Sequence, residues 1–94
     1  MGKASLFSAQ WGKCAVTGIE FATLDNIQCH HIIPRWMGGT DKYQNLILIL
    51  PLVHRLIHAS KADTIAHYLN ILNLDAKQLL KVNDLRKKAG HAEI

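Results

Sequence analysis

Residues 29–59 read CHHIIPRWMGGTDKYQNLILILPLVHRLIHA, and their pattern predicts the central elements of the fold. The partial alternation of apolar and polar residues over 27–32 predicts a short strand. The uninterrupted apolar run over 46–50 is typical of a second strand that is buried on both faces. Pro51 suits the first turn of a helix, where a missing amide donor costs nothing, and this helix should run to about Ser60. The expected order is therefore strand, loop, strand, helix.

Further elements are expected on both sides of this stretch. Residues 4–11 have the spacing of a helix, and residues 13–21 read as two short strands about a turn, an N-terminal hairpin. Two more helices should follow, over about 63–73 and about 76–89. The apolar face of the second is expected to consist of Leu79, Leu80, Val82 and Leu85. This second helix has the clearest start, because Asp75–Gln78 has the spacing of a capping box. Together these elements predict an α+β fold.

Size and composition limit the classes of protein that fit. The chain has 94 residues, so one domain is expected over 1–94, with a core of about 12–60 and a helical extension of about 62–90. No apolar run approaches the ~18 residues that a membrane span requires, and the N-terminus lacks the apolar stretch of a secretion signal. We therefore expect a soluble, cytoplasmic protein with no membrane contact. A net charge of +4 suits a polyanionic partner.

Four of the six histidines lie within residues 30–58. His54 and His58 are four residues apart in sequence, which places them on one face of the predicted helix. Their Cβ atoms should then lie about 6 Å apart, so that both imidazoles can reach one metal ion. His30 and His31 are adjacent on the predicted strand and therefore point to opposite faces. One of them can complete a metal site with the helix pair while the other faces a substrate. The alternatives are solvent-facing surface histidines and a half-buried structural ring.

The spacing of these residues resembles a known motif, that of the HNH endonucleases. Along the chain the motif is His30-His31, thirteen residues, Asn45, eight residues, His54, three residues, His58. The glycine pair and the residues that follow it (GGTDKYQN) are also common in that family. The resemblance covers about residues 12–60 and implies a small ββα-metal (His-Me finger) core.

A narrower resemblance covers more of the chain. The segments GKCAVTG, CHHIIPRWMGGTD, NLILI and VHRLIHA, with the helical tail that follows them, are similar to the C-terminal endonuclease domain of bacterial group II intron-encoded reverse transcriptase/maturase proteins. This resemblance implies that the module nicks the second target strand during insertion. Its partners would then include intron RNA and the reverse transcriptase of a parent protein.

The family resemblance also implies an activity and a role for each motif residue. The activity is metal-dependent hydrolysis of phosphodiester bonds in double-stranded or nicked DNA, with one divalent ion. His31 corresponds to the general base, and Asn45 to the residue that holds the loop backbone so that His31 is aimed. The metal ligands correspond to His30, His54 and His58.

The predicted ligand set narrows the choice of metal. Imidazoles favour transition metals, so Zn²⁺, Ni²⁺, Co²⁺ or Mn²⁺ should bind best. Mg²⁺ prefers oxygen ligands, but a loosely bound Mg²⁺ or Mn²⁺ with open water positions can still support faster turnover. Because imidazole ligands are uncharged, the ion keeps its double positive charge for the phosphate.

The chain departs from the family at a second metal site. Many relatives carry a structural zinc on two pairs of cysteines, which here would be Cys14 with Thr17, and Leu50 with Val53. One thiol cannot complete a four-ligand site, so no structural zinc is expected. We expect apolar packing of Leu50 and Val53 in its place, with Cys14 and Cys29 as small buried thiols.

Basic and aromatic residues supply candidate DNA contacts. The last predicted helix is rich in Lys and Arg, Arg86 among them, which suits contact with a phosphate backbone. Trp36 lies in the loop near the histidines and can stack on a base, whereas Trp11 is expected to pack in the core. The candidate contacts are Arg35, Trp36, Arg55, Lys81 and Lys87. Each basic residue is alternatively a solvated surface side chain. His67 and His91 have no partners at ligand spacing and are assigned no function.

Two other functions also fit this sequence. One is a catalytically silent, metal-braced module that binds nucleic acid, and the other is a histidine-rich metal-binding regulator without affinity for DNA. The enzyme differs from both in one expectation: replacing His31 by alanine should abolish cutting but spare metal binding and the fold.

Overall fold

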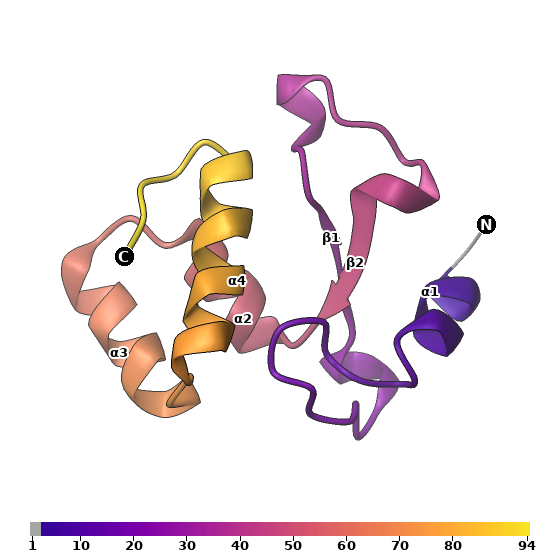
Figure 1. The fold of residues 1–94 in the computed structure, drawn as a ribbon, viewed down its shortest axis with the longest axis horizontal. Helices are drawn as coiled ribbons and strands as arrows, with labels where there is room; N and C mark the ends of the chain where they lie inside the picture. The colour runs from indigo at the N-terminus through magenta and orange to yellow at the C-terminus, as the bar shows by residue number, and fades with distance from the viewer. Residues whose placement is uncertain (1–2) are drawn as a thin grey trace.

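A computed structural model of the chain describes residues 3–94. The helices and strands in this range are α1 (Lys3–Ala9), β1 (Gln28–His31), β2 (Leu46–Ile49), α2 (Pro51–His58), α3 (Ala62–Leu72) and α4 (Ala76–Lys88). Single 3-10 turns lie at Leu24–Asn26, Arg35–Met37 and Tyr43–Asn45. Figure 1 shows α3 and α4 on one side of the two strands and α1 on the other.

The two strands form an antiparallel pair. His30 of β1 lies opposite Ile47 of β2, and His31 lies opposite Leu46. Helix α2 begins just after β2 and contacts β1, so the chain from β1 to α2 is a ββα unit. The predicted α+β class and the predicted order of elements are confirmed.

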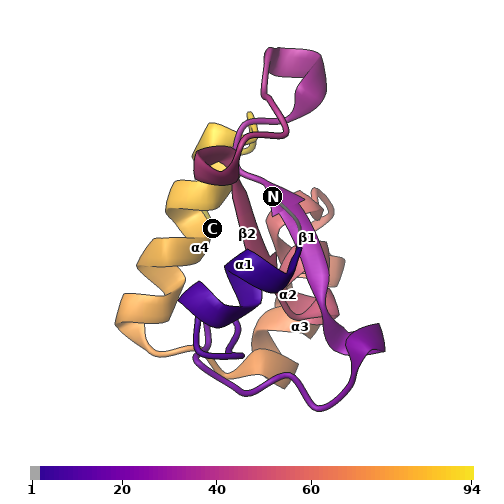
Figure 2. The ribbon, with the colours of Figure 1, turned by 90° about the vertical axis from the view of Figure 1, so that its right-hand side faces the viewer.

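Helix α2 lies at the centre of the apolar core. Its Val53, Leu56 and Ile57 are fully buried, together with Ile49 of β2 and Val82 of α4. The spacing of these α2 residues places them on one stripe of the helix, which packs against α3 and α4. Figure 2, turned by 90°, shows α1 in front of the strands, where it contacts β2.

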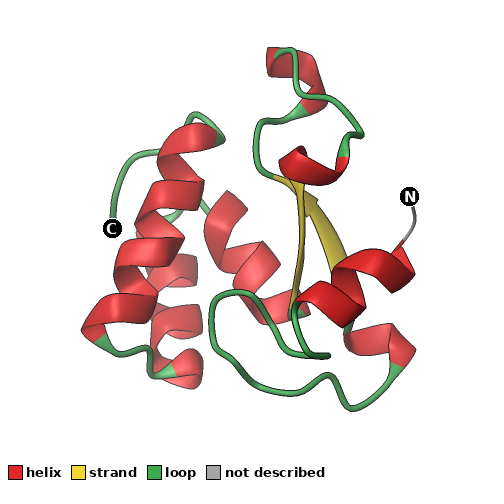
Figure 3. Cartoon of the chain, turned by 45° about the vertical axis from the view of Figure 1, so that its right-hand side comes forward, coloured by secondary structure: helices red, strands yellow, loops and turns green. Residues whose placement is uncertain are grey.

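The loop between the strands projects beyond the end of the sheet. Figure 3 shows its two short helical turns on either side of an extended segment. Gly39 allows this loop to fold back on itself, because a Cβ there would lie 1.7 Å from the carbonyl oxygen of Ile33. Only glycine fits at such a close approach of two backbone segments.

The predicted N-terminal hairpin is smaller than expected. The two strands predicted over 13–21 are reduced to one antiparallel bridge between Lys13 and Glu20. The backbone amide of Ala15 instead donates to the carbonyl of Leu48 in β2, 3.0 Å away. This part of the chain therefore has one backbone bond to the central sheet, while the amides of Cys14 and Phe21 donate to carbonyls within residues 12–21.

Two apolar side chains lie outside the core against expectation. Trp11 is 84% exposed, and its positive φ of 57° follows the end of α1, so its side chain leaves the direction of the helix. Leu80 is 69% exposed, because it lies about 200° around α4 from the buried Val82. The predictions that Trp11 packs in the core and that Leu80 belongs to the apolar face are both wrong.

The start of α4 is as predicted. The Asp75 side chain accepts a hydrogen bond from the Gln78 amide at 2.7 Å, and the Gln78 side chain accepts one from the Asp75 amide at 3.0 Å. This is the reciprocal arrangement of a capping box. Over residues 3–94, no helix has the length and apolar character needed to cross a membrane.

Candidate active site

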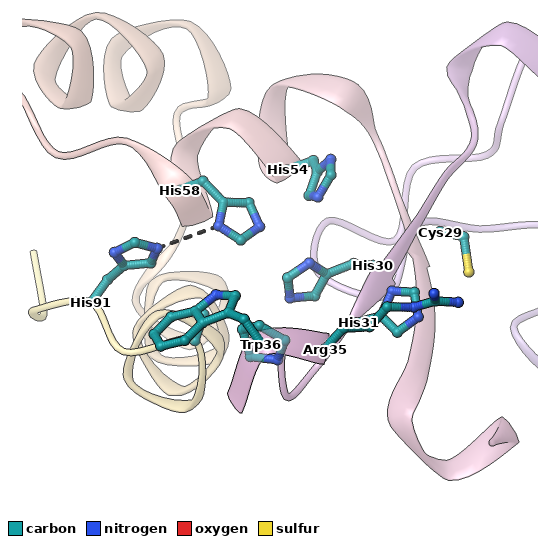
Figure 4. A pocket seen from close by; sticks show the side chains of 10 residues that line it. Cys29, His30, His31, Arg35, Trp36, His54, His58 and His91 are labelled. Atoms are coloured by element: carbon teal, nitrogen blue, oxygen red, sulfur yellow. Dashed lines mark hydrogen bonds between the residues drawn. The ribbon is translucent and has the colours of Figure 1, made fainter. Parts of the chain in front are cut away.

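Three histidines converge from two elements. His30 comes from β1, and His54 and His58 come from successive turns of α2. One ring nitrogen of each lies within 4.8 Å of the corresponding nitrogens of the other two. The ring centroids are 5.0–5.3 Å apart, and Figure 4 shows the rings facing a common space. The predicted convergence of these three side chains is therefore present.

The environment of His30 fits a metal ligand. Its side chain is only 2% exposed, and within the described residues its Nε2 atom has no hydrogen-bond partner. An unsatisfied buried polar atom costs about 1–3 kcal/mol. A divalent ion held by the three rings would satisfy this atom, and an all-imidazole donor set suits a transition metal.

The protonation of the cluster also fits metal binding. Burial lowers the pKa of His30 to about 4, with smaller contributions from the neighbouring His54 and His58. Burial likewise lowers the pKa of His54 and of His58. All three rings are then neutral at neutral pH, which is the form of histidine that binds a metal ion.

His31 lies outside the three-histidine group and contacts a carboxylate. Its Nε2 atom lies 2.7 Å from Oδ1 of Asp41, to which Arg35 Nε also donates at 3.2 Å. The hydrogen bond with His31, followed by that with Arg35, lowers the pKa of Asp41. Because an ionised carboxylate only accepts hydrogen bonds, Nε2 of His31 is the donor in this contact. In a neutral ring with this tautomer, the lone pair lies on Nδ1.

Asn45 closes the loop that connects β1 to β2. Its Nδ2 donates to the carbonyls of Ile33 at 3.0 Å and Thr40 at 2.8 Å, while its Oδ1 accepts from the Ile33 amide at 2.8 Å. These bonds join the residues just after His31 to the segment that carries Asp41. The side chain of Asn45 thus bonds to the loop backbone on both sides of the turn, while its catalytic role remains a prediction.

The sequence model of the HNH endonucleases matches residues 13–60, about half of the chain. This chain belongs to the HNH endonuclease family. It is 55% identical over 31 residues to the "Probable mobile endonuclease B" of Enterobacteria phage T4, an alignment that covers 33% of this chain and 12% of that protein. The chain therefore spans a small fraction of the length of this relative. No solved structure matches it significantly.

The HNH region contains the histidine cluster, His31 and Asn45, but the site extends beyond it. Ring nitrogens of His58 and His91 lie 3.3 Å apart, and His91 lines the same pocket as the cluster. Sequence analysis missed His91, because 33 residues separate it from His58 and no local spacing connects the two.

Arg86 serves the HNH core and not a DNA-facing surface. It is 3% exposed and donates to the carbonyls of Leu56, Ile57 and Ala59 at 2.6–3.2 Å. These are carbonyls at the C-terminal end of α2, which have no partner within the helix. Its inclusion among the basic residues available to a phosphate backbone is therefore wrong.

The candidate nucleic-acid contacts fall into two groups. Arg35 and Trp36 line the pocket of the histidine cluster, and Trp36 is 80% exposed. Arg55, Lys81 and Lys87 are exposed but do not line it. Of these, Lys87 is paired with Glu93 at 2.9 Å. The first group is thus placed beside the cluster, while the second lies on the outer surface of the helices.

The positions of the missing cysteine pairs lie in apolar surroundings. Cys14 and Val53 belong to one buried cluster, and Leu50 packs against it. Cys29 differs from expectation, because it is partly exposed and lies at the edge of the histidine pocket.

Proposed function

We propose that this HNH protein is a DNA endonuclease that hydrolyses phosphodiester bonds with one divalent metal ion and His31 as general base. The observation that carries the proposal is the division among four neighbouring histidines. Three neutral rings, those of His30, His54 and His58, share one space. The fourth, that of His31, lies outside this group and contacts the Asp41 carboxylate through Nε2, which leaves Nδ1 as the proposed proton acceptor.

The reaction requires an activated water and relief of charge on the phosphate. Nδ1 of His31 takes a proton from water as the water oxygen attacks phosphorus, and the bond from phosphorus to the leaving oxygen breaks. Asp41 keeps the Nε2 proton in place and stabilises the imidazolium that forms. When bound by His30, His54 and His58, a divalent ion would supply positive charge to the phosphate and to the departing 3′ oxygen. The departing 3′ oxygen takes a proton from solvent water, so the products are 5′-phosphate and 3′-hydroxyl ends.

Asn45 would act on the base through the loop. Its three side-chain bonds fix the backbone on both sides of the turn between His31 and Asp41. A fixed loop holds the imidazole and the carboxylate at hydrogen-bond distance, so the base needs no rearrangement when substrate binds. Asn45 is thus proposed as a positioning residue.

The DNA would approach along the pocket that contains Arg35 and Trp36. Arg35 is exposed, and its pairing with Asp41 leaves guanidinium donors for a phosphate oxygen. The exposed indole of Trp36 offers a stacking face for a base. Arg55, Lys81 and Lys87 would add contacts to the backbone that are independent of sequence. Double-stranded or nicked DNA is the expected substrate.

We place this activity within a longer protein of a mobile element. The sequence resembles the endonuclease domains of group II intron-encoded proteins, and the name of the phage relative describes a mobile endonuclease. So small a chain has little surface for reading a sequence, so the site of cutting would be chosen by a parent reverse transcriptase or its intron RNA.

A plasmid nicking assay with Mg²⁺, Mn²⁺, Co²⁺, Ni²⁺ and Zn²⁺ tests the proposal. His31→Ala should lower the rate of nicking about 10²–10⁴-fold, the usual share of a general base, and should leave metal affinity unchanged. His67→Ala is the matched control, because His67 is an exposed histidine on α3. A wild-type protein that binds metal and DNA but nicks with none of these ions would support the silent module. Metal binding without DNA binding would support the regulator.

A further inference from the structure

His91 lies beside the metal-ligand cluster but outside the region shared with the HNH family. It follows α4, in the C-terminal tail. Its Nε2 atom lies 3.3 Å from Nδ1 of His58, and the two rings meet nearly at right angles, with an interplanar angle of 82°. Figure 4 shows this contact as a dashed line and shows the other ring nitrogen of His58 on the side of His54 and His30.

The tail that carries His91 is fixed by several bonds. The amide of His91 donates to the carbonyl of Arg86 at 2.8 Å, and Nε of Arg86 donates to the carbonyl of Ala92 at 2.8 Å. Farther along, Ile94 exchanges two hydrogen bonds with the side chain of Asn83, at 2.8 and 3.0 Å. The imidazole of His91 is therefore presented from an anchored backbone.

The same arginine fixes the other partner of the contact. Nη1 of Arg86 donates to the carbonyls of Leu56, Ile57 and Ala59, which surround His58 at the end of α2. Arg86 thus joins the turn that presents His58 to the tail that presents His91. The buried side chain of Arg86 therefore sets the distance between His58 and His91.

We propose that His91 is a positioning residue of the metal centre, which accepts a hydrogen bond from Nδ1–H of His58. The inference rests on the proposed metal site. A neutral imidazole that binds a metal through Nε2 must carry its proton on Nδ1, and a ligand histidine almost always donates that proton to a neighbouring acceptor. His91 supplies the acceptor, and it thereby fixes both the tautomer of His58 and the direction of its Nε2 lone pair.

His91 is assigned to this outer position and not to the ion itself. Among residues 3–94, the group whose ligand atoms lie within 4.8 Å of one another consists of His30, His54 and His58. His91 faces the opposite nitrogen of His58, so it acts on the ion through that ring. Loss of such an outer partner typically costs 10–100-fold in metal affinity, roughly.

The test is a competition titration of the full chain with Zn²⁺, together with the visible spectrum of the Co²⁺ form. His91→Ala should raise the Kd for Zn²⁺ roughly 10–100-fold without changing the Co²⁺ spectrum, because the ligands stay the same. His91→Gln keeps a side-chain acceptor and should restore most of the affinity. His67→Ala should have no effect. Nitrogen chemical shifts of the imidazoles in the Zn²⁺ form of the wild type should report His58 protonated at Nδ1.

The possible failures are distinguishable. If wild type does not bind Zn²⁺ or Co²⁺, the proposed metal site fails and this inference fails with it. If wild type binds and His91→Ala binds equally well, only the role of His91 is overturned. A Co²⁺ spectrum that changes in His91→Ala would make His91 a direct ligand and overturn the outer position. If His91→Ala does not fold, the proposal is tested by the tautomer of His58 in the Zn²⁺ form of the wild type. A His58 ring protonated at Nε2 would contradict the proposal.

Discussion

Protonation of His30 should destabilise the metal-free protein as the pH falls. Its pKa is about 4 in the folded chain against 6.5 as the ordinary value. The unfolded chain therefore binds more protons between these values, so the free energy of unfolding rises with pH in this window. The stability is fully present above about pH 6.5 and is lost as the pH falls towards about 4. At 1.36 kcal/mol per unit of pKa, the free energy of unfolding falls by about 3 kcal/mol in total. About 2 kcal/mol of this loss has occurred by pH 5.

The measurement is urea unfolding of the chelator-treated protein at several pH values. His30→Leu removes the titrating group and its unsatisfied nitrogen and introduces an apolar side chain of similar size. The difference between wild type and this variant isolates the effect of His30 from the effects of His54 and His58, whose pKa values are lowered as well. The expected result is a wild-type curve that falls about 2 kcal/mol more than that of His30→Leu between neutral pH and about pH 5.

Two results would refute this reasoning. One is a pair of parallel curves, in which the variant loses as much stability as the wild type. The other is a direct titration of the wild-type His30 ring by NMR that gives an ordinary pKa near 6.5, which would mean that burial in the cluster does not exclude water.

Three further predictions concern the surroundings of the cluster. Asp41→Asn should lower kcat for nicking by roughly tenfold to a hundredfold, because it disturbs the general base. The affinity for Zn²⁺ should not change, and a loss of that affinity would contradict the assignment. In urea unfolding, Arg86→Met should lower the free energy of unfolding by about 2–4 kcal/mol, whereas Lys81→Met should change it by less than about 0.5 kcal/mol. Equal effects of the two substitutions would refute the role of Arg86 in stabilising the end of α2. In DNA-binding titrations, Lys81→Met should reduce the slope of log Kd against log salt concentration by about 1, and Lys87→Met by less, because Lys87 already pairs with Glu93. The reverse order would place Lys87 on the DNA.

The convergence of the histidines could be predicted because it depends on local geometry. Spacing of four residues on a helix fixes the relation of His54 to His58, and the alternation of a strand separates His30 from His31. The element order then leaves few ways to bring a strand and the following helix together. These rules act over a few residues, so one sequence is enough to apply them.

The parts that could not be predicted depend on contacts between distant segments. From the sequence, Arg86 is predicted to be a surface cation on a basic helix. Only the packing of α4 on α2 places its guanidinium over the C-terminal end of α2. His91 has no neighbour in sequence that marks it. Trp11 is the opposite case, since its size favours burial, but its left-handed backbone conformation directs it outward. In each case tertiary position overrides a preference that belongs to the residue type.

The position of His58 explains why the segment after the HNH region matters to the site. Helix α2 has only eight residues, fewer than the roughly 12–15 that an isolated helix needs in water. Its stability must therefore come from packing, and its last turn is the part most prone to fray. That turn carries His58, so fraying there would move one ligand nitrogen away from the other two. Arg86 occupies the free carbonyls of this turn and holds His91 against His58 through the tail. A chain cut before α4 would then keep every motif residue but hold them in a looser geometry, and its metal affinity would fall even where the fold of the remaining core survived.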